Sequence, residues 1–182
     1  MSDSPHLPEF DDEVVRAMAR WPDVPQCFGW LGLDRRGAWR IRGEIISHER
    51  AVAFLGRHYR SDAEGRWFVQ NGPQQVFVEL DYTPWIYRYD AHSGFTTHTG
   101  LGANELRTVV VDDEGNLLVE SELGIGLVDD RDLAACAERL DYEADEPRAF
   151  RWHGRPLTVI RLARQAMAAR WGYVQHPAPV SA

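Results

Sequence analysis

The chain has 182 residues, of which 44% are hydrophobic and 26% charged, and its formal net charge is -8. This length allows one large domain or two small ones, with an apolar core that needs no disulfide or metal. The acidic balance argues against nucleic acid as a partner and against docking on anionic membranes, because both bind electropositive surfaces. All 20 basic residues are arginines, so no lysine can provide amine chemistry.

The cellular compartment is predicted from the cysteines and the hydropathy. Cys27 and Cys136 are far apart and have neither metal nor redox spacing, which is typical of reduced thiols. Residues 1–12 are polar and acidic, unlike a signal peptide, and no apolar run reaches the length of a membrane span. We therefore expect a soluble bacterial protein of the cytoplasm, with no cofactor.

The first part of the chain predicts a short helix that ends at Trp21, a hairpin with strands at 29–33 and 38–42, and a second helix over 48–59. In the hairpin, alternation places Trp39 on the face opposite Arg40. The inner stripe of the second helix consists of Ala51, Phe54, Leu55 and His58.

Short strands follow in close succession. They are expected at 66–70, 75–80, 85–89, 94–99, 107–111, 116–121 and 124–128. Connections this short predict antiparallel pairing, because a parallel crossover needs about a dozen residues. The last elements are expected to be a helix that begins at Asp129 or Asp130, an acidic loop over 141–146, a strand over 149–153 and a helix over 158–170.

Two segments of the chain resemble each other. Residues 38–43 and 149–154 share the order aromatic, arginine, apolar, base, glycine, and residues 66–70 match 170–175 with one insertion. A duplicated strand–helix–strand unit explains this similarity, and chance is the alternative. The expected fold class is α+β, rich in antiparallel strands, with the duplicated unit in two small subdomains. We expect three parts: residues 1–28 form an N-terminal segment that includes a short helix, residues 29–103 form a first α+β subdomain, and residues 104–182 form a second one.

Arginines and aromatic residues provide the first candidate site. Arg40, Arg42, Arg66 and Trp85 belong to strands or their ends, and Asn71 opens a glycine-containing turn that can present backbone N–H groups to an anion. Guanidinium groups bind phosphate or carboxylate through paired hydrogen bonds, and indole rings stack on nucleobases. We predict that these five residues bind a small anionic ligand. A tryptophan-rich core with arginines extended along its surface is the alternative interpretation, and the commoner one.

Histidines and carboxylates provide the second candidate. His92 and His98 lie six residues apart, and Glu79 and Asp81 share one face of a strand. Such residues can hold a divalent metal or perform acid–base catalysis. Ordinary solvent-exposed positions explain both pairs without a function, and they are the commoner case.

The order of elements over residues 29–90 resembles the proteobacterial family of domain of unknown function 1285. The residues that carry the resemblance are Gly32-Leu33-Asp34 to Gly37-Ala38-Trp39, Gly43-Glu44-Ile45-Ile46, Phe54-Leu55, 66–70, 75–80 and Pro84-Trp85. The chain departs from the family pattern at 71–74, where the family carries Thr-Pro-x-Glu, and at His48, where it carries arginine. The resemblance implies a duplicated core, a C-terminal part similar to a pleckstrin-homology barrel, a nucleotide-type ligand between the halves and a role in signalling.

The function expected from the sequence is therefore a small-molecule-binding or regulatory module without catalysis, whose ligand is anionic and nucleotide-like. Two alternatives stay open: a metal-dependent enzyme that uses His92 and His98 with Glu79 or Asp81, and a protein-interaction module, including a homo-oligomer.

Overall fold

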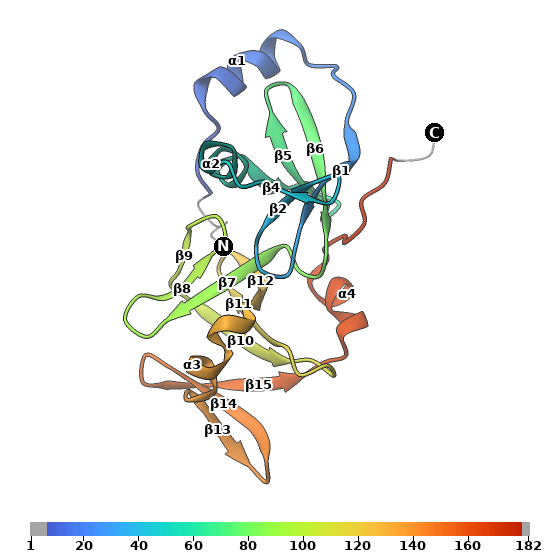
Figure 1. The fold of residues 1–182 in the computed structure, drawn as a ribbon. Coiled ribbons are helices and arrows are strands. Elements are labelled where there is room, and N and C mark those ends of the chain that lie inside the picture. Colours follow the sequence, from blue (N-terminus) through green and yellow to red (C-terminus); the bar gives the residue numbers. More distant parts are fainter. Residues whose placement is uncertain (1–6, 180–182) are drawn as a thin grey trace. The chain divides into compact units, whose positions relative to one another are not determined.

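The computed structural model describes residues 7–179, which form two compact units (Figure 1). The N-terminal unit contains residues 7–84 together with 172–179, and the central unit contains Trp85–Trp171. This division differs from the expected boundary at 103/104. Its cause is strand pairing, because Trp85 and its neighbours pair with the strand around Gly126 and so belong with the later part of the chain.

The N-terminal unit is built on a six-stranded sheet with the order β3-β2-β1-β6-β5-β4. Its strands are β1 (Cys27–Leu33), β2 (Trp39–Ile41), β3 (Glu44–Ile45), β4 (Tyr59–Ser61), β5 (Trp67–Asn71) and β6 (Gln74–Leu80). β1 and β6 run parallel, and every other neighbouring pair is antiparallel. Two helices belong to this unit, α1 (Asp12–Arg20) and α2 (Glu49–Arg57).

One face of this sheet carries a buried aromatic and aliphatic core. Tyr59 on β4 contacts Trp39 edge-on, with ring centroids 5.1 Å apart, and packs against Trp67 at 4.7 Å. Leu33 and Val78 are also fully buried. The alternation of β2 is confirmed, since Trp39 is 1% exposed while its neighbour Arg40 forms ion pairs in part-exposed positions.

The C-terminal segment returns to the N-terminal unit. Val174 forms a parallel bridge with Arg66, and its N–H donates to the carbonyl of Gly65. Gly65 has φ +76°, and a Cβ at this position would lie 1.9 Å from the carbonyl oxygen of Gly172. Only glycine fits this close approach. Two segments that resemble each other in sequence, 66–70 and 170–175, therefore meet here.

The central unit is built on a nine-stranded sheet with the order β13-β14-β15-β10-β11-β12-β7-β8-β9. Its strands are β7 (Trp85–Asp90), β8 (Gly94–Thr97), β9 (Gly102–Ala103), β10 (Leu106–Val111), β11 (Leu117–Ser121), β12 (Gly124–Val128), β13 (Leu140–Glu143), β14 (Glu146–Trp152) and β15 (Arg155–Arg161). Its short helical segments are η1 (Asp130–Asp132), α3 (Leu133–Ala137), η2 (Arg164–Ala166) and α4 (Met167–Trp171). Most neighbouring strands are antiparallel, whereas β10–β15 and β7–β12 are parallel.

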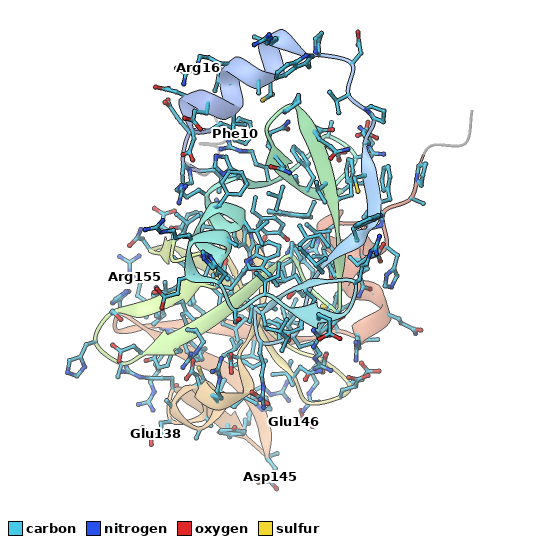
Figure 2. The ribbon with its side chains drawn as sticks, turned by 45° about the horizontal axis from the view of Figure 1, so that its top comes forward. Phe10, Arg16, Glu138, Asp145, Glu146 and Arg155 are labelled. Atoms are coloured by element: carbon cyan, nitrogen blue, oxygen red, sulfur yellow. The ribbon has the colours of Figure 1, made fainter. Side chains whose placement is uncertain are left out.

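The end of the central unit contradicts two sequence predictions. The expected acidic loop over 141–146 belongs mostly to the paired strands β13 and β14, which leave Ala144 and Asp145 as the turn, and Figure 2 shows Asp145 at its tip. The expected helix over 158–170 is wrong in its first part, because β15 occupies Arg155–Arg161 and only α4 is α-helical. Val159 and its neighbours pair with β10, a strand distant in sequence, and β-branched residues favour this extended conformation.

The sequence similarity between 38–43 and 149–154 corresponds to a shared hairpin turn. Arg42 and Gly43 have φ 51° and 88°, and His153 and Gly154 have φ 46° and 75°. Two consecutive positive φ values are the signature of a type I′ turn. Both hairpins are followed by a helix, but the second hairpin has a seven-residue returning strand in place of the two residues of β3. The α+β class, rich in antiparallel strands, is confirmed.

No helix within residues 7–179 is long and apolar enough to cross a bilayer.

Candidate functional site

A cavity of about 580 Å³ lies between α2 and the sheet of the N-terminal unit. We call it the α2 cavity. It is lined by Cys27, Trp30, Leu31, Ile41, Ile46, Ala51, Phe54, Leu55, Val69, Asn71, Gln74 and Val76. Nearly all of these side chains are apolar, and the cavity opens to solvent past Trp30 and Ile41, which are 49% and 48% exposed.

The helix that forms one wall is fixed at both ends. His48 is the N-cap, and its Nδ1 accepts a hydrogen bond of 3.4 Å from the N–H of Ala51. At the other end His58 is fully buried, where its Nδ1–H donates to the carbonyl of Phe54 and its Nε2 accepts from the N–H of Asp11. Arg57 adds an ion pair with the Asp11 carboxylate at 3.0 Å.

The apolar side chains of α2 do not pack tightly against the sheet. Ala51, Phe54 and Leu55 line the cavity, and no residue of α2 between its caps is fully buried. An amphipathic helix normally buries such a stripe against its own core. Here the stripe faces an open space.

The opposite wall is shaped by an irregularity in β1. Cys27 is paired with Val76 and Leu31 with Val78, so four residue steps on β1 match two on β6. Gly29 lies inside this bulge with φ +73°. Bulges redirect side chains, and here both Trp30 and its neighbour Leu31 line the same cavity instead of alternating.

The rim carries one cation in a defined position. The guanidinium carbon of Arg42 lies 3.7 Å from the centroid of the Trp30 ring, and the N–H of Arg42 donates to the carbonyl of Trp30. Within the described part of the chain, Arg42 has no ion pair and no side-chain hydrogen bond. Its guanidinium face is used by the indole, and its N–H edges remain available.

Two amide side chains, those of Asn71 and Gln74, belong to the lining. Gln74 donates from Nε2 to the carbonyl of Pro25 at 3.0 Å. Asn71 lies at the end of β5, and its side chain has no hydrogen bond with any residue in 7–179. Asn71 can therefore orient a ligand, whereas Gln74 is occupied.

The structure brings only two of the five predicted ligand residues to this cavity. Arg42 is on its rim and Asn71 is in its lining. Arg40 instead pairs with Asp34 at 2.9 Å and Asp81 at 3.3 Å.

The other two predicted residues lie elsewhere. Arg66 pairs with Asp62 at 2.8 Å and stacks over Phe77. Trp85 belongs to the central unit, where it is 1% exposed and donates from Nε1 to the carbonyl of Leu123. Anion binding by the set of five stays a prediction.

The histidines and the carboxylates of the second candidate belong to different units. His92 lies in an exposed turn of the central unit, and burial lowers the pKa of His98 in the same unit to about 3. Glu79 and Asp81 belong to the N-terminal unit, where Glu79 pairs with His176 at 2.8 Å. Residues 7–179 contain no group of three or more His, Cys, Asp or Glu side chains that could hold a metal ion.

Neither Trp30 nor Cys27 was predicted from the sequence to line a ligand site. The one signal that could have found them is Gly29, because a glycine inside a strand pattern often marks a bulge. The helix stripe was predicted, but its distance from the sheet depends on the tertiary structure.

These observations define an α+β protein whose N-terminal unit holds an apolar, partly open cavity under an amphipathic helix. The chain belongs to the family DUF2944, described as "Protein of unknown function (DUF2946)", whose model matches residues 10–178. No curated protein matches the chain.

Two solved structures of DUF1285 family proteins match the chain. One is from Silicibacter pomeroyi DSS-3, with 17% identity, a TM-score of 0.53 and coverage of 75% of this chain and 82% of that chain. The other is from Shewanella baltica OS155, with 12% identity, a TM-score of 0.46 and coverage of 61% and 92%. The resemblance to DUF1285 proteins predicted from the sequence is confirmed at the level of the fold.

Proposed function

We propose that this protein is a small-molecule-binding module without catalytic activity, and that its site is the α2 cavity. The observation that carries the proposal is a space of about 580 Å³ beneath the apolar stripe of a capped helix. Ligand pockets usually measure about 300–1,000 Å³ and are mostly apolar with a few polar groups. Protein interiors are otherwise close-packed, so a ligand that fills this space gains dispersion contacts with both walls.

The lining supports binding rather than turnover. Among the described residues that form it, the polar side chains are those of Cys27, Asn71, Gln74 and the Trp30 indole. Residues 7–179 place no carboxylate, imidazole or hydroxyl in the lining, so this part of the chain does not supply the pair of groups that general acid–base catalysis requires. A regulatory role follows if occupancy holds α2 in place, because the ligand would then supply the packing that the sheet does not.

A nucleotide is not the ligand that this lining favours. Phosphate groups need several converging donors, whereas Arg40 and Arg66 are already paired with carboxylates. Nucleotides nevertheless belong in a ligand screen, as the prediction from the sequence requires.

The test uses two alanines of α2. Ala51 lines the cavity and Ala53 lies on the exposed outer face of the same helix. We expect the neutral fluorescent probe N-phenylnaphthylamine to bind the wild type saturably, one molecule per chain. Ala51→Phe fills the space and should abolish this binding, whereas Ala53→Phe should leave it unchanged. Absence of saturable binding, or equal loss in both variants, contradicts the proposal.

A second candidate function is self-association through the rim of the cavity. Trp30, Ile41 and Ile45 are 49%, 48% and 61% exposed, and Ile45 lies on the edge strand β3. Exposed apolar groups on a sheet edge can pair two copies of a chain. Sedimentation velocity at several concentrations tests this candidate, and a monomer at every concentration removes it.

A further inference from the structure

We infer that the ligand of the α2 cavity is an amphipathic monoanion, with an apolar chain inside the cavity and a single carboxylate-like head group held by Arg42. This inference rests on the proposed function and adds the chemical class of the ligand. Three features of the described residues support it: the distribution of polarity around the cavity, the unpaired state of Arg42 and the geometry of its turn.

The polarity of the cavity changes from its interior to its rim. Deep residues such as Leu31 and Val69 are 4% and 1% exposed and purely apolar. Arg42 is an exposed residue at the β2–β3 turn, next to the lining residue Ile41 in sequence, and its guanidinium stacks on the lining residue Trp30. A ligand that matches this gradient has an apolar body and one polar end.

Within residues 7–179 Arg42 has no carboxylate partner, which distinguishes it from three other arginines of the same unit. Arg40, Arg57 and Arg66 each form an ion pair with an aspartate, at 2.9, 3.0 and 2.8 Å respectively. Arg42 is instead stacked on an indole. Stacking uses the flat face of the guanidinium and leaves its N–H donors in the ring plane, where they fit the two oxygens of a carboxylate.

The turn holds Arg42 in a conformation that side chains rarely adopt. Its φ is 51°, and Gly43 follows with φ 88°. Asparagine is the residue that type I′ turns prefer before glycine. Arg42→Asn therefore removes the charge in a backbone that accepts the substitution, so the variant is expected to fold.

A second positive charge, that of Arg50, lies close to the cavity, and the test must distinguish its effect from that of Arg42. Arg50 precedes the lining residue Ala51 on α2 and is exposed, without an ion pair in the described chain. Arg16 is exposed on α1 (Figure 2) and does not line the cavity. Arg50→Gln and Arg16→Gln thus serve as a near and a remote control for the loss of one positive charge.

The experiment is displacement of N-phenylnaphthylamine from the full chain by two matched series, the sodium salts of hexanoic, octanoic and decanoic acid and the corresponding n-alcohols. In both series we expect affinity to rise about fourfold for each added methylene until the cavity is full. At equal length and low salt the carboxylate should bind about fivefold more tightly than the alcohol, as for a partly exposed ion pair. This preference should shrink at high salt.

The arginine variants decide the assignment. Arg42→Asn should abolish the preference for carboxylates and keep the dependence on chain length, while Arg50→Gln and Arg16→Gln should keep both. Equal affinity for acids and alcohols in the wild type overturns the inference, as does a preference that Arg50→Gln removes and Arg42→Asn does not.

Failure of the inference can be told apart from failure of the proposed function. If the probe binds, Ala51→Phe blocks it and head-group charge has no effect, the cavity binds small molecules but not monoanions. If the probe does not bind at all, both proposals are wrong. Loss of probe binding in step with dimer formation would assign the cavity to a second copy of the chain and would also overturn the inference.

Discussion

The two units of this protein treat their apolar surface differently. The described chain has six large hydrophobic side chains that are strongly exposed, and only Tyr142 belongs to the central unit. The others, in the N-terminal unit, are Val15, Trp21, Trp30, Ile41 and Ile45. Both units seal an aromatic core, since Phe77 of the N-terminal unit and Phe95 and Phe150 of the central unit are 0% exposed, so the difference lies in the exposed side chains.

Both units contain arginines paired with carboxylates, and Arg42 is an exception. In the central unit the fully buried Asp129 would have a raised pKa from burial, but hydrogen bonds from Arg131 lower that pKa to about 2. Arg88 lies 2.6 Å from Asp132 in the same group. In the N-terminal unit, Arg42 has no carboxylate partner among the described residues and stacks on Trp30 of the α2 cavity. Charged side chains that are paired within the protein stabilise its fold, whereas a cation without such a partner can bind an anionic ligand.

The two cysteines give the largest expected contrast between the units. Burial raises the pKa of the Cys136 thiol to about 12, whereas Cys27 is half-buried and lines the α2 cavity. Because the thiolate is the reactive form, this shift should slow alkylation of Cys136 about a thousandfold relative to an ordinary thiol. We expect N-ethylmaleimide to modify Cys27 alone in the folded protein, as measured by peptide mass spectrometry.

Ligand occupancy should then be visible at Cys27. Saturating N-phenylnaphthylamine is expected to slow its alkylation, and unfolding in urea should expose both thiols as a control. Rapid modification of Cys136 in the native protein would mean that the central unit is not sealed.

Two leucines test the contrast in packing by the same chemical change. Leu118 is 0% exposed in the central sheet, whereas Leu55 faces the α2 cavity. Leu118→Ala should lower the free energy of unfolding by about 3 kcal/mol, because it creates a void in a packed core. Leu55→Ala enlarges an existing space and should cost about 1 kcal/mol, mainly the lost transfer energy.

The measurement is urea unfolding, with hydrogen exchange used to follow the unit that carries each substitution. An equal loss of stability in the two variants would show that α2 packs tightly onto the sheet in solution. The open cavity, and with it the proposed site, would then have to be abandoned.

Local sequence patterns were sufficient to predict most strands and turns. The strand predicted over 124–128 has the same bounds in the structure, and the hairpin around Asp34 and Gly37 is where alternation and turn residues placed it. In these segments, neighbours in sequence are also neighbours in space, so the period of two and the glycines carry enough information. The prediction of a helix over 158–170 failed because its first part is the strand β15, whose parallel partner β10 lies far away in the sequence.

The candidate site was only partly accessible to the same reasoning. Residue types pointed to Arg42 and Asn71, but nothing in the sequence distinguishes Arg42 from Arg40. Arg40 is neutralised by Asp34, six positions away, and by Asp81, 41 positions away, and both contacts depend on the folded turn and sheet. The cavity depends likewise on the β1 bulge and on how far α2 stands from the sheet, and both are tertiary properties.

The smallest effect concerns the pH dependence of the central unit, through His98. Its Nδ1 accepts a hydrogen bond from the N–H of Ile86, and burial lowers the pKa of the imidazole from 6.5 to about 3. Below pH 6.5 the unfolded chain therefore takes up a proton that the folded chain does not, so stability falls as the pH falls. At about pH 5 this loss should reach about 2 kcal/mol relative to neutral pH.

His98→Asn isolates this contribution, because an amide oxygen can accept the same hydrogen bond but does not titrate. The pKa values of Asp129 and Asp132 are lowered from the ordinary carboxyl value of 3.8. Both carboxylates therefore stay ionised in the folded and the unfolded chain between neutral pH and pH 5, and they contribute little to the change in stability over this range. Urea titrations of the two proteins at both pH values should show the wild type losing about 2 kcal/mol more than the variant. The same pH dependence in both would mean that the imidazole is hydrated, and that the central unit is less sealed than the comparison requires.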